Sequence, residues 1–184
     1  MKTNKTMSTI DLIVLGILQK KQMNAYEITH FIDEMNINRL IKISSPAVYK
    51  VCKRLYKSEF LNGKTIRDGE NPEKIVYSVN AKGKTHFYNL MHHFSSQIQP
   101  FFFDFNTFLW NIDQLEPQKS SEMLGNLQVQ LRQLRDWVVS HEKEVSRAPF
   151  AIRMIVKQYR MTLNTLVKWI TEVVQDFEKE NKKK

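Results

Sequence analysis

The chain reads Ser44-Ser45-Pro46-Ala47-Val48-Tyr49-Lys50-Val51-Cys52-Lys53-Arg54-Leu55 at the stretch that decides its fold. This stretch predicts a helix, because Ser45 can cap the first turn and Pro46 at the first helical position has no N–H to leave unpaired. Apolar residues at helical spacing form one face, namely Val48, Val51, Cys52 and Leu55. Basic residues lie largely off that face: Lys50, Lys53, Arg54 and Lys57.

The residues that follow predict a β-hairpin. A short apolar run ends at Phe60-Leu61, and the polar turn 68–72 separates it from the alternating segment Lys74-Ile75-Val76-Tyr77-Ser78-Val79. A basic helix followed at once by a hairpin is the layout of a winged helix-turn-helix, whose helix enters the major groove of DNA. We therefore expect a mainly α fold with a small β-hairpin wing.

Two short helices are expected before this stretch and one after it. Ser8 with Asp11, and Asn24 with Glu27, resemble capping boxes that open apolar series at helical spacing. The three helices would form a small trihelical core with the hairpin over its open side. Asn80 could cap a fourth helix. We assign residues 8–90 to a winged helix-turn-helix DNA-binding domain.

Composition favours a polyanionic partner. The formal net charge is +9, and residues 1–90 hold 15 Lys and Arg against 8 Asp and Glu, whereas residues 91–184 hold 13 against 11. A positive first half suits phosphate contacts, although the same charge could serve solubility alone.

Cys52 is the only cysteine, so no intrachain disulfide can form. No apolar run approaches the roughly 20 residues that span a bilayer. Residues 1–8 lack the apolar core of a signal peptide, and we expect a cytoplasmic protein.

The last third predicts two long helices that form an antiparallel hairpin near residues 146–149. Heptad positions in the first helix are Leu124, Leu127, Leu131, Leu134, Val138, His141 and Val145. Those in the second are Ile152, Val156, Tyr159, Leu163, Leu166, Ile170, Val173 and Phe177. Sustained heptads of this kind pack knobs-into-holes. Further apolar positions widen the stripe beyond one partner helix, so a second copy is the economical partner. We assign residues 91–184 to a helical dimerisation and effector domain. The residues expected to form the dimer contact are heptad residues: Leu124, Leu131, Val138, Val156, Tyr159, Leu163, Leu166, Ile170, Val173 and Phe177.

An aromatic segment follows Pro100 and contains Phe101-Phe102-Phe103, Phe105, Phe108 and Trp110. So dense a patch predicts core packing. The other interpretation is a pocket for a flat ligand, formed by Phe102, Phe105 and Trp110.

Contact with DNA is expected from the basic helix and its neighbours. Lys50, Lys53 and Arg54 would enter the groove with Tyr49, while Lys64 and Arg67 on the wing would reach the flanking backbone. Ser44 and Ser45 lie at a helix N-terminus, where free N–H groups attract phosphate. Tyr26 would touch the phosphate strand or lie half-buried in the core.

Catalysis finds little support. Paired carboxylates, a metal-spaced Cys/His cluster and a nucleophile elbow are all missing from the sequence, so we expect no enzyme, metal or cofactor. His92 and His93 are adjacent and would point about 100° apart on a helix, too far to chelate one ion well.

Four motifs of this sequence recur in a known family: Ser45-Pro46-Ala47-Val48-Tyr49, Lys53-Arg54-Leu55, Phe60-Leu61 and Tyr77-Ser78-Val79-Asn80-Ala81-Lys82-Gly83. They resemble the Ser-Pro-x-x-Tyr, wing-preceding Leu and Tyr-x-Leu-Thr-x-x-Gly patterns of the PadR-like transcriptional regulators. The helices after Pro100 are similar to the virulence-activator (AphA-like) branch. The resemblance implies a homodimer that binds an inverted-repeat operator and usually represses. It also implies, for some members, release of DNA when small aromatic compounds bind between the dimer halves.

The chain departs from the family pattern at several positions. Glu59 stands between helix and wing where the family has Gly, which is favoured there because the chain turns through a positive φ. Ala25 replaces the usual Gly of the second helix, a mild change. Val79 and Asn80 stand where the family has Leu and Thr, and these changes are conservative on physical grounds.

Two rival interpretations stay open. The first is a winged-helix adaptor that binds protein instead of nucleic acid. The second is a ligand-binding or enzymatic helical protein that uses the aromatic segment.

Overall fold

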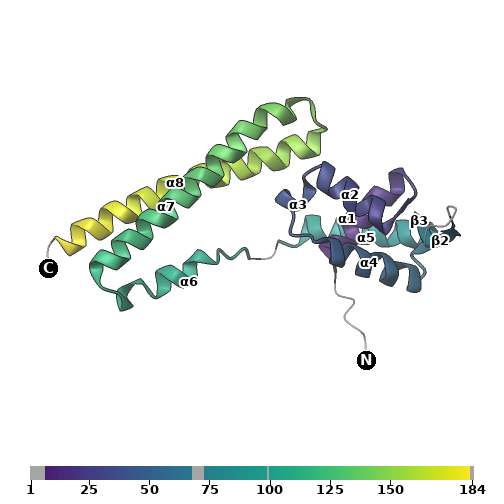
Figure 1. Ribbon diagram of the computed structural model, residues 1–184, viewed down its shortest axis with the longest axis horizontal. Coiled ribbons are helices and arrows are strands. Elements are labelled where there is room, and N and C mark those ends of the chain that lie inside the picture. The colour runs from purple at the N-terminus through teal and green to yellow at the C-terminus, as the bar shows by residue number, and fades with distance from the viewer. Residues whose placement is uncertain (1–6, 68–72, 99, 183–184) are drawn as a thin grey trace. The chain divides into compact units, whose positions relative to one another are not determined.

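The structure is a computed structural model that describes residues 7–67, 73–98 and 100–182 (Figure 1). The chain divides into two compact units, Met1–Pro100 and Phe101–Lys184. The boundary expected between residues 90 and 91 falls inside helix α5 (Ala81–Ser96), all of which belongs to the first unit. The first unit therefore extends beyond that expected boundary.

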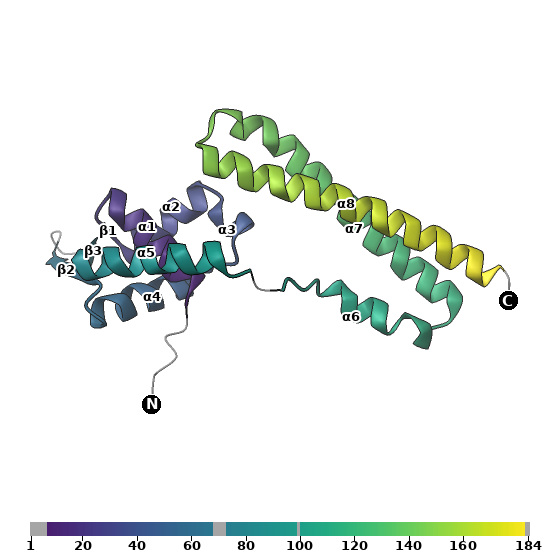
Figure 2. The same cartoon turned by 180° about the vertical axis from the view of Figure 1, so that it is seen from behind.

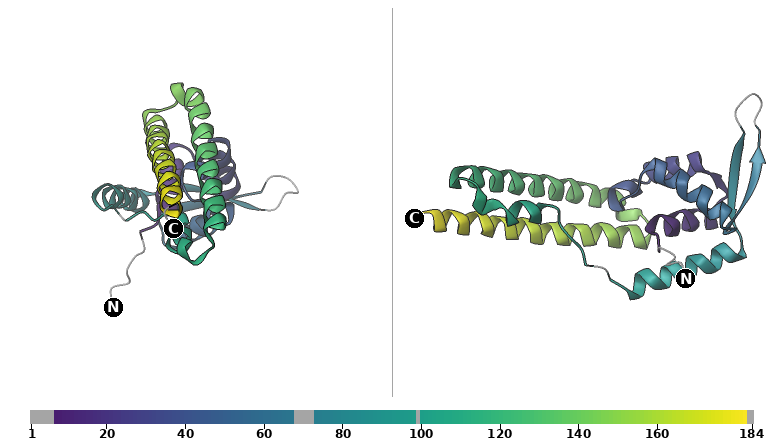
Figure 3. Two further views of the ribbon diagram at one scale, coloured as in Figure 1. Left: turned by 90° about the vertical axis from the view of Figure 1, so that its left-hand side faces the viewer. Right: turned by 90° about the horizontal axis from the view of Figure 1, so that it is seen from below.

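The first unit combines short helices with a three-stranded antiparallel sheet of order β1-β3-β2. In chain order its elements are α1 (Thr9–Lys20), β1 (Met23–Asn24), α2 (Ala25–Glu34), α3 (Ile37–Leu40), α4 (Ser45–Lys57), β2 (Leu61–Ile66), β3 (Lys74–Val79) and α5. We call the β2–β3 hairpin the wing; Figure 3 shows its strands projecting beyond the helices of this unit. The expected winged helix-turn-helix is confirmed. The predicted turn 68–72 lies outside the described residues.

Capping contacts begin the helices largely as expected. Asn24 and Glu27 form a complete capping box, and the Asn80 side chain accepts a hydrogen bond from the Gly83 N–H. Ser8 accepts from the Asp11 N–H. For α4 the predicted cap was wrong by one residue, because Ser44 is extended and its carbonyl already accepts from the Val48 N–H. Ser45 is therefore helical, and Ser44 makes no side-chain cap bond.

The core of the first unit fills the space between α1, α2, α4 and the sheet, and α5 packs against α1 (Figure 2). Val48 and Leu55 of α4 are buried there with Leu15 of α1 and Ile28 of α2. Complete burial of one such side chain contributes about 1.5–3 kcal/mol. Cys52 is buried in the same core, and burial raises the pKa of its thiol to about 12. The apolar face of α4 is thus fixed inward, so its basic residues lie at the surface.

The second unit contains α6 (Phe105–Trp110), α7 (Pro117–Glu144) and α8 (Phe150–Asn181), with short 3₁₀ turns at Ile112–Gln114 and Val145–Arg147. Helices α7 and α8 run side by side as the expected antiparallel hairpin (Figures 1 and 3). Heptad residues buried within one chain are Leu124, Leu131, Val138, Val156, Leu163 and Ile170. Tyr159, Leu166, Val173 and Phe177 are partly buried. The heptad seam therefore joins the two helices of a single chain.

The aromatic segment is divided between core and surface. Phe105 and Phe108 of α6 pack against the α7–α8 core, and the Phe105 ring stacks on Trp169 at a centroid distance of 5.6 Å. Phe102 and Trp110, in contrast, are 85% and 88% exposed. The expected core packing thus applies to only part of the segment, since Phe105 packs in the core while Phe102 and Trp110 are exposed.

Gly83 lies where α5 meets the backbone at the start of the wing. A Cβ at this position would lie 2.1 Å from the Phe60 carbonyl oxygen, whereas a Cβ at Gly16 of α1 would meet only the Phe87 ring at 3.5 Å. We expect Gly83→Ala to lower the free energy of unfolding by about 1–3 kcal/mol, since backbone must move. Gly16→Ala should be neutral or stabilising by up to about 1 kcal/mol. Urea denaturation of both variants measures the difference, and equal midpoints would contradict this packing.

Candidate nucleic-acid interface

The exposed side of α4 carries three lysines in one row. Lys50, Lys53 and Lys57 are spaced three and four residues apart, which places them on one face of a helix. All three are exposed, and Tyr49 lies beside them near the start of the helix. Lys50 and Lys53, which were expected to enter the groove, are therefore exposed on a surface that a phosphate-lined groove could contact.

The wing packs beside α4 through two tyrosines. The Tyr56 ring contacts the Tyr77 ring of β3 at a centroid distance of 5.9 Å. Gly63 of β2 pairs with Tyr77, and a Cβ at Gly63 would lie 2.8 Å from the Tyr56 ring. A larger residue there would have to displace the Tyr56 ring or the Ile75 side chain. Gly63 thus permits the close approach that brings the wing next to the cationic face.

The wing carries its cations at the surface. Lys64 pairs across the strands with Val76, and because side chains alternate along a strand it lies on the opposite face of the wing from Gly63. Arg67 follows the end of β2 and is exposed. Lys74 begins β3 and is also exposed. By this register Lys64 and Lys74 share one face of the wing.

A cleft of about 940 Å³ lies between α2, α4 and β3. Its lining includes Tyr26, Tyr49, Lys74, Ile75 and Tyr77. Tyr26 is 68% exposed and stacks on His30, with ring centroids 6.3 Å apart. The structure therefore places Tyr26 at the surface and not in the core. Both surface tyrosines named in the sequence analysis thus line one concave surface beside the wing.

Ser44 and Ser45 lie exposed at the N-terminus of α4. They line a smaller cleft of about 310 Å³ together with Asn38 and Asp33. The Asn38 amide donates to the Asp33 carboxylate at 2.7 Å. This end of α4 is accessible, and the neighbouring carboxylate partly offsets the attraction of its N–H groups for a phosphate.

Arg54 differs from the three lysines because it has a buried partner. Its guanidinium pairs with the Asp11 carboxylate of α1, which is 1% exposed. His86 of α5 approaches the same carboxylate, with its Nε2 3.7 Å from Oδ2, and stacks on Phe60 at 4.4 Å between centroids. Asp11, which the sequence suggested only as part of a capping box, is thus the buried acceptor that ties α4 to α1. Arg54 contributes to holding α4 in place and is less available to DNA than expected.

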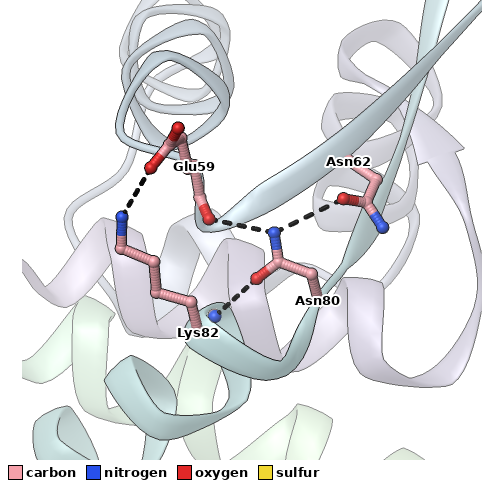
Figure 4. Close-up of polar contacts among 5 residues, drawn as sticks. Glu59, Asn62, Asn80 and Lys82 are labelled. Atoms are coloured by element: carbon pink, nitrogen blue, oxygen red, sulfur yellow. Dashed lines mark hydrogen bonds and ion pairs between the residues drawn. The ribbon is translucent and has the colours of Figure 1, made fainter.

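Glu59 forms the corner between α4 and the wing. Its φ of 59° lies in the left-handed region, as the family pattern of Gly at this position indicated. Figure 4 shows how the corner is held: the Asn80 amide donates to the Glu59 carbonyl at 2.9 Å and to the Asn62 side chain at 3.4 Å. The Lys82 ammonium lies 2.9 Å from the Glu59 carboxylate and lowers the pKa of that group. Backbone bonds close the same turn, since the Phe60 N–H donates to the Leu55 carbonyl at 2.9 Å. The turn thus forms without glycine, held by backbone and neighbouring side chains together.

Groups suited to metal binding do not gather anywhere in the described parts of the chain, where no set of three or more His, Cys, Asp or Glu could hold an ion. Helices long and apolar enough to cross a membrane are likewise missing from the described residues.

Residues 14–89 match the transcriptional regulator PadR-like family, which confirms the resemblance drawn from the motifs. A comparison with curated proteins found no match.

Solved structures share the fold over nearly the whole chain. Bacillus subtilis PadR in complex with operator DNA is 17% identical with a TM-score of 0.74, covering 91% of this chain and 97% of that chain. The PadR-like regulator BC1756 from Bacillus cereus is 14% identical with a TM-score of 0.68, covering 94% and 99%. The Vibrio cholerae virulence activator AphA is 16% identical with a TM-score of 0.66, again covering 94% and 99%. At these identities the likeness shows the fold.

The Arg54–Asp11 pair predicts a difference between adjacent cations of α4. Arg54→Ala leaves the buried Asp11 carboxylate with only His86 near it and should lower the free energy of unfolding. The expected loss is roughly 1–3 kcal/mol, at the lower end of the range for a buried pair because half of the Arg54 side chain is in water. Lys53→Ala, at an exposed neighbouring position, should change it by less than about 0.5 kcal/mol. Chemical denaturation of both variants provides the measurement. Equal midpoints would show that the pair does not hold α4 on α1.

Proposed function

We propose that this chain, whose residues 14–89 form a domain of the PadR-like family of transcriptional regulators, binds an inverted-repeat operator as a homodimer and represses transcription. The observation that carries the proposal is the exposed lysine row of α4 beside the wing and its cleft. Positive side chains on a helix of this width suit the major groove, where phosphates supply the sequence-independent part of the affinity. Bacillus subtilis PadR, which shares the fold, has been crystallised with operator DNA.

In this proposal, residues of α4 contact the groove and residues of the wing contact the DNA backbone. Lys50, Lys53 and Tyr49 face the groove from α4, while Lys64 and Arg67 reach the flanking backbone from the wing. Tyr26 and the start of α4 at Ser44 and Ser45 meet the phosphate strand. Arg54 serves mainly to orient α4. These assignments follow from exposure and position.

Dimerisation uses apolar side chains that the α7–α8 hairpin leaves uncovered. One such side of α7 carries Met123, Leu127, Leu134 and Trp137, which are exposed or partly buried. Six of the heptad residues expected at the dimer contact are buried within the hairpin of one chain, so this proposal moves the contact to side chains that the hairpin leaves at the surface. We therefore place the second copy against this other side, in a two-fold arrangement. Two DNA-binding units would then meet sites about one helical turn, or 34 Å, apart.

A small aromatic effector is a secondary part of the proposal. Another Bacillus subtilis PadR structure contains p-coumaric acid. In this chain the exposed rings of Phe102 and Trp110 would need a second copy to complete an enclosed site. We further propose that the protein acts in the cytoplasm and is not an enzyme.

Salt dependence tests the lysine row. Lys50→Ala and Lys53→Ala should each weaken binding to duplexes of any sequence and reduce the slope of log affinity against log salt by about one. Lys168→Ala is the control, because this exposed lysine lies on α8 in the other unit. Fluorescence anisotropy with labelled duplexes measures these slopes. Unchanged slopes for both α4 variants would refute this face, and a wild-type chain that ignores duplex DNA would favour the protein-binding adaptor.

Two exposed apolar residues of α7 test the dimer surface. Leu134 and Val129 are 49% and 47% exposed and lie on different sides of the helix, about 140° apart. Leu134→Asp should halve the particle mass, because it places a charge in the proposed interface. Val129→Asp should leave the mass unchanged. Light scattering on the full chain gives both values, and a Leu134→Asp particle of wild-type mass would contradict this surface.

A further inference from the structure

We propose that Asn80 is a positioning residue for DNA binding, which sets the orientation of the wing relative to α4 without touching DNA. The inference rests on the function proposed above, since it concerns how the wing reaches DNA. It assigns a role to two positions, 59 and 80, at which this chain departs from the family pattern.

Asn80 connects the three elements that meet at the corner (Figure 4). Its amide nitrogen donates to the Glu59 carbonyl, where α4 has ended, and to the Asn62 side chain on β2. Its amide oxygen accepts from the Gly83 N–H in the first turn of α5 at 2.9 Å. Its own backbone N–H donates to the Phe60 carbonyl at 3.4 Å. One side chain therefore ties the direction of β2 to the start of α5.

The chemistry of an amide explains why Asn is suited to this position. Ser, Thr, Asp and Asn can all cap a helix by accepting a hydrogen bond. Among these, only Asn also carries an NH₂ group, which supplies the two donors at the corner. A Thr at position 80 would keep the cap of α5 and leave the Glu59 carbonyl without this donor. The second function of Asn80 is therefore separable from capping.

Glu59 shows why the chain needs the additional donor. A residue with a Cβ resists the left-handed conformation, whereas Gly adopts it freely. Here the conformation is held from both ends, with the Asn80 amide on the backbone carbonyl and Lys82 on the side chain. Glu59 and Asn80 thus act as a pair, in which the Asn80 amide holds the backbone of a non-glycine residue in the left-handed conformation.

The corner has little freedom to adjust elsewhere. Phe60 is buried and stacked on His86, and Gly83 packs so closely on the Phe60 carbonyl that no Cβ fits. A change in the Glu59 turn must therefore move the wing, because the α5 side is fixed. Lys64 lies on β2 a few residues beyond this corner and would move with it. Lys50, on the other side of the corner in α4, would not.

The test is a double-mutant cycle on the full chain with a labelled mixed-sequence duplex of about 30 base pairs, roughly three helical turns. Asn80→Ser retains a capping oxygen, removes the amide donors and leaves the charge unchanged. We expect it to weaken binding about fivefold, the scale of one or two lost hydrogen bonds. Lys64→Ala should then cost much less affinity in the Asn80→Ser background than in the wild type. Lys50→Ala should cost the same factor in both backgrounds.

Two further measurements separate positioning from loss of fold. Adding Glu59→Gly to Asn80→Ser should recover most of the lost affinity, because Gly holds the turn without the clamp. Thermal unfolding reports the folded fraction at the assay temperature, and Asn80→Asp, also a good cap, replaces Asn80→Ser should the latter unfold. The proposal is overturned if Asn80→Ser binds like wild type, or if Lys64→Ala costs the same factor in both backgrounds. A wild-type chain without salt-dependent binding would instead overturn the proposed function, and this inference with it.

Discussion

The contact between Gly83 and the Phe60 carbonyl is the constraint on which the proposed DNA-binding surface depends. It brings the start of α5 against the chain where α4 has ended and β2 begins. The wing must therefore leave this corner beside α4, and the Tyr56–Tyr77 contact holds it there. A left-handed residue is needed because the chain reverses within a few residues, and Glu59 takes that role. The positions of the wing cations relative to the lysine row follow from this corner.

The cations of α4 serve two different purposes, although the sequence presents them as one basic face. Arg54 is bound to the buried Asp11 carboxylate, so its charge is largely used within the fold. Lys50, Lys53 and Lys57 point to solvent and add to the positive potential of the surface. A basic helix in a small domain can thus combine an internal anchor with an external binding row. The second unit shows the same division, with heptad residues such as Leu131 and Leu163 buried in its own hairpin and others such as Leu134 left at the surface.

Local sequence patterns predicted most of the helices and strands. They could not predict contacts between residues that are far apart in the sequence. Helical periodicity and the caps at Asn24 and Asn80 located α2 and α5, and alternation located the wing. Helix α3 and strand β1 are too short to produce a periodic signal. No local pattern could reveal that Asp11 is buried against Arg54, 43 positions away. Heptads predicted that α7 and α8 pack, but the spacing is the same whether the partner helix belongs to the same chain or to a second copy. The exposure of Phe102 and Trp110 likewise depends on which other residues cover them, and the high number of aromatic residues in this segment does not indicate that.

The central claim is that α4 and the wing form a surface for duplex DNA and that a homodimer presents two of these surfaces. Selection of bound duplexes from a random library by the full-length protein tests it most directly. The account predicts enrichment of an inverted repeat whose half-sites are centred about one helical turn apart, since two α4 helices must meet one face of the duplex. Retention of no duplex in low-salt buffer, or enrichment of a single unsymmetrical site, would contradict it.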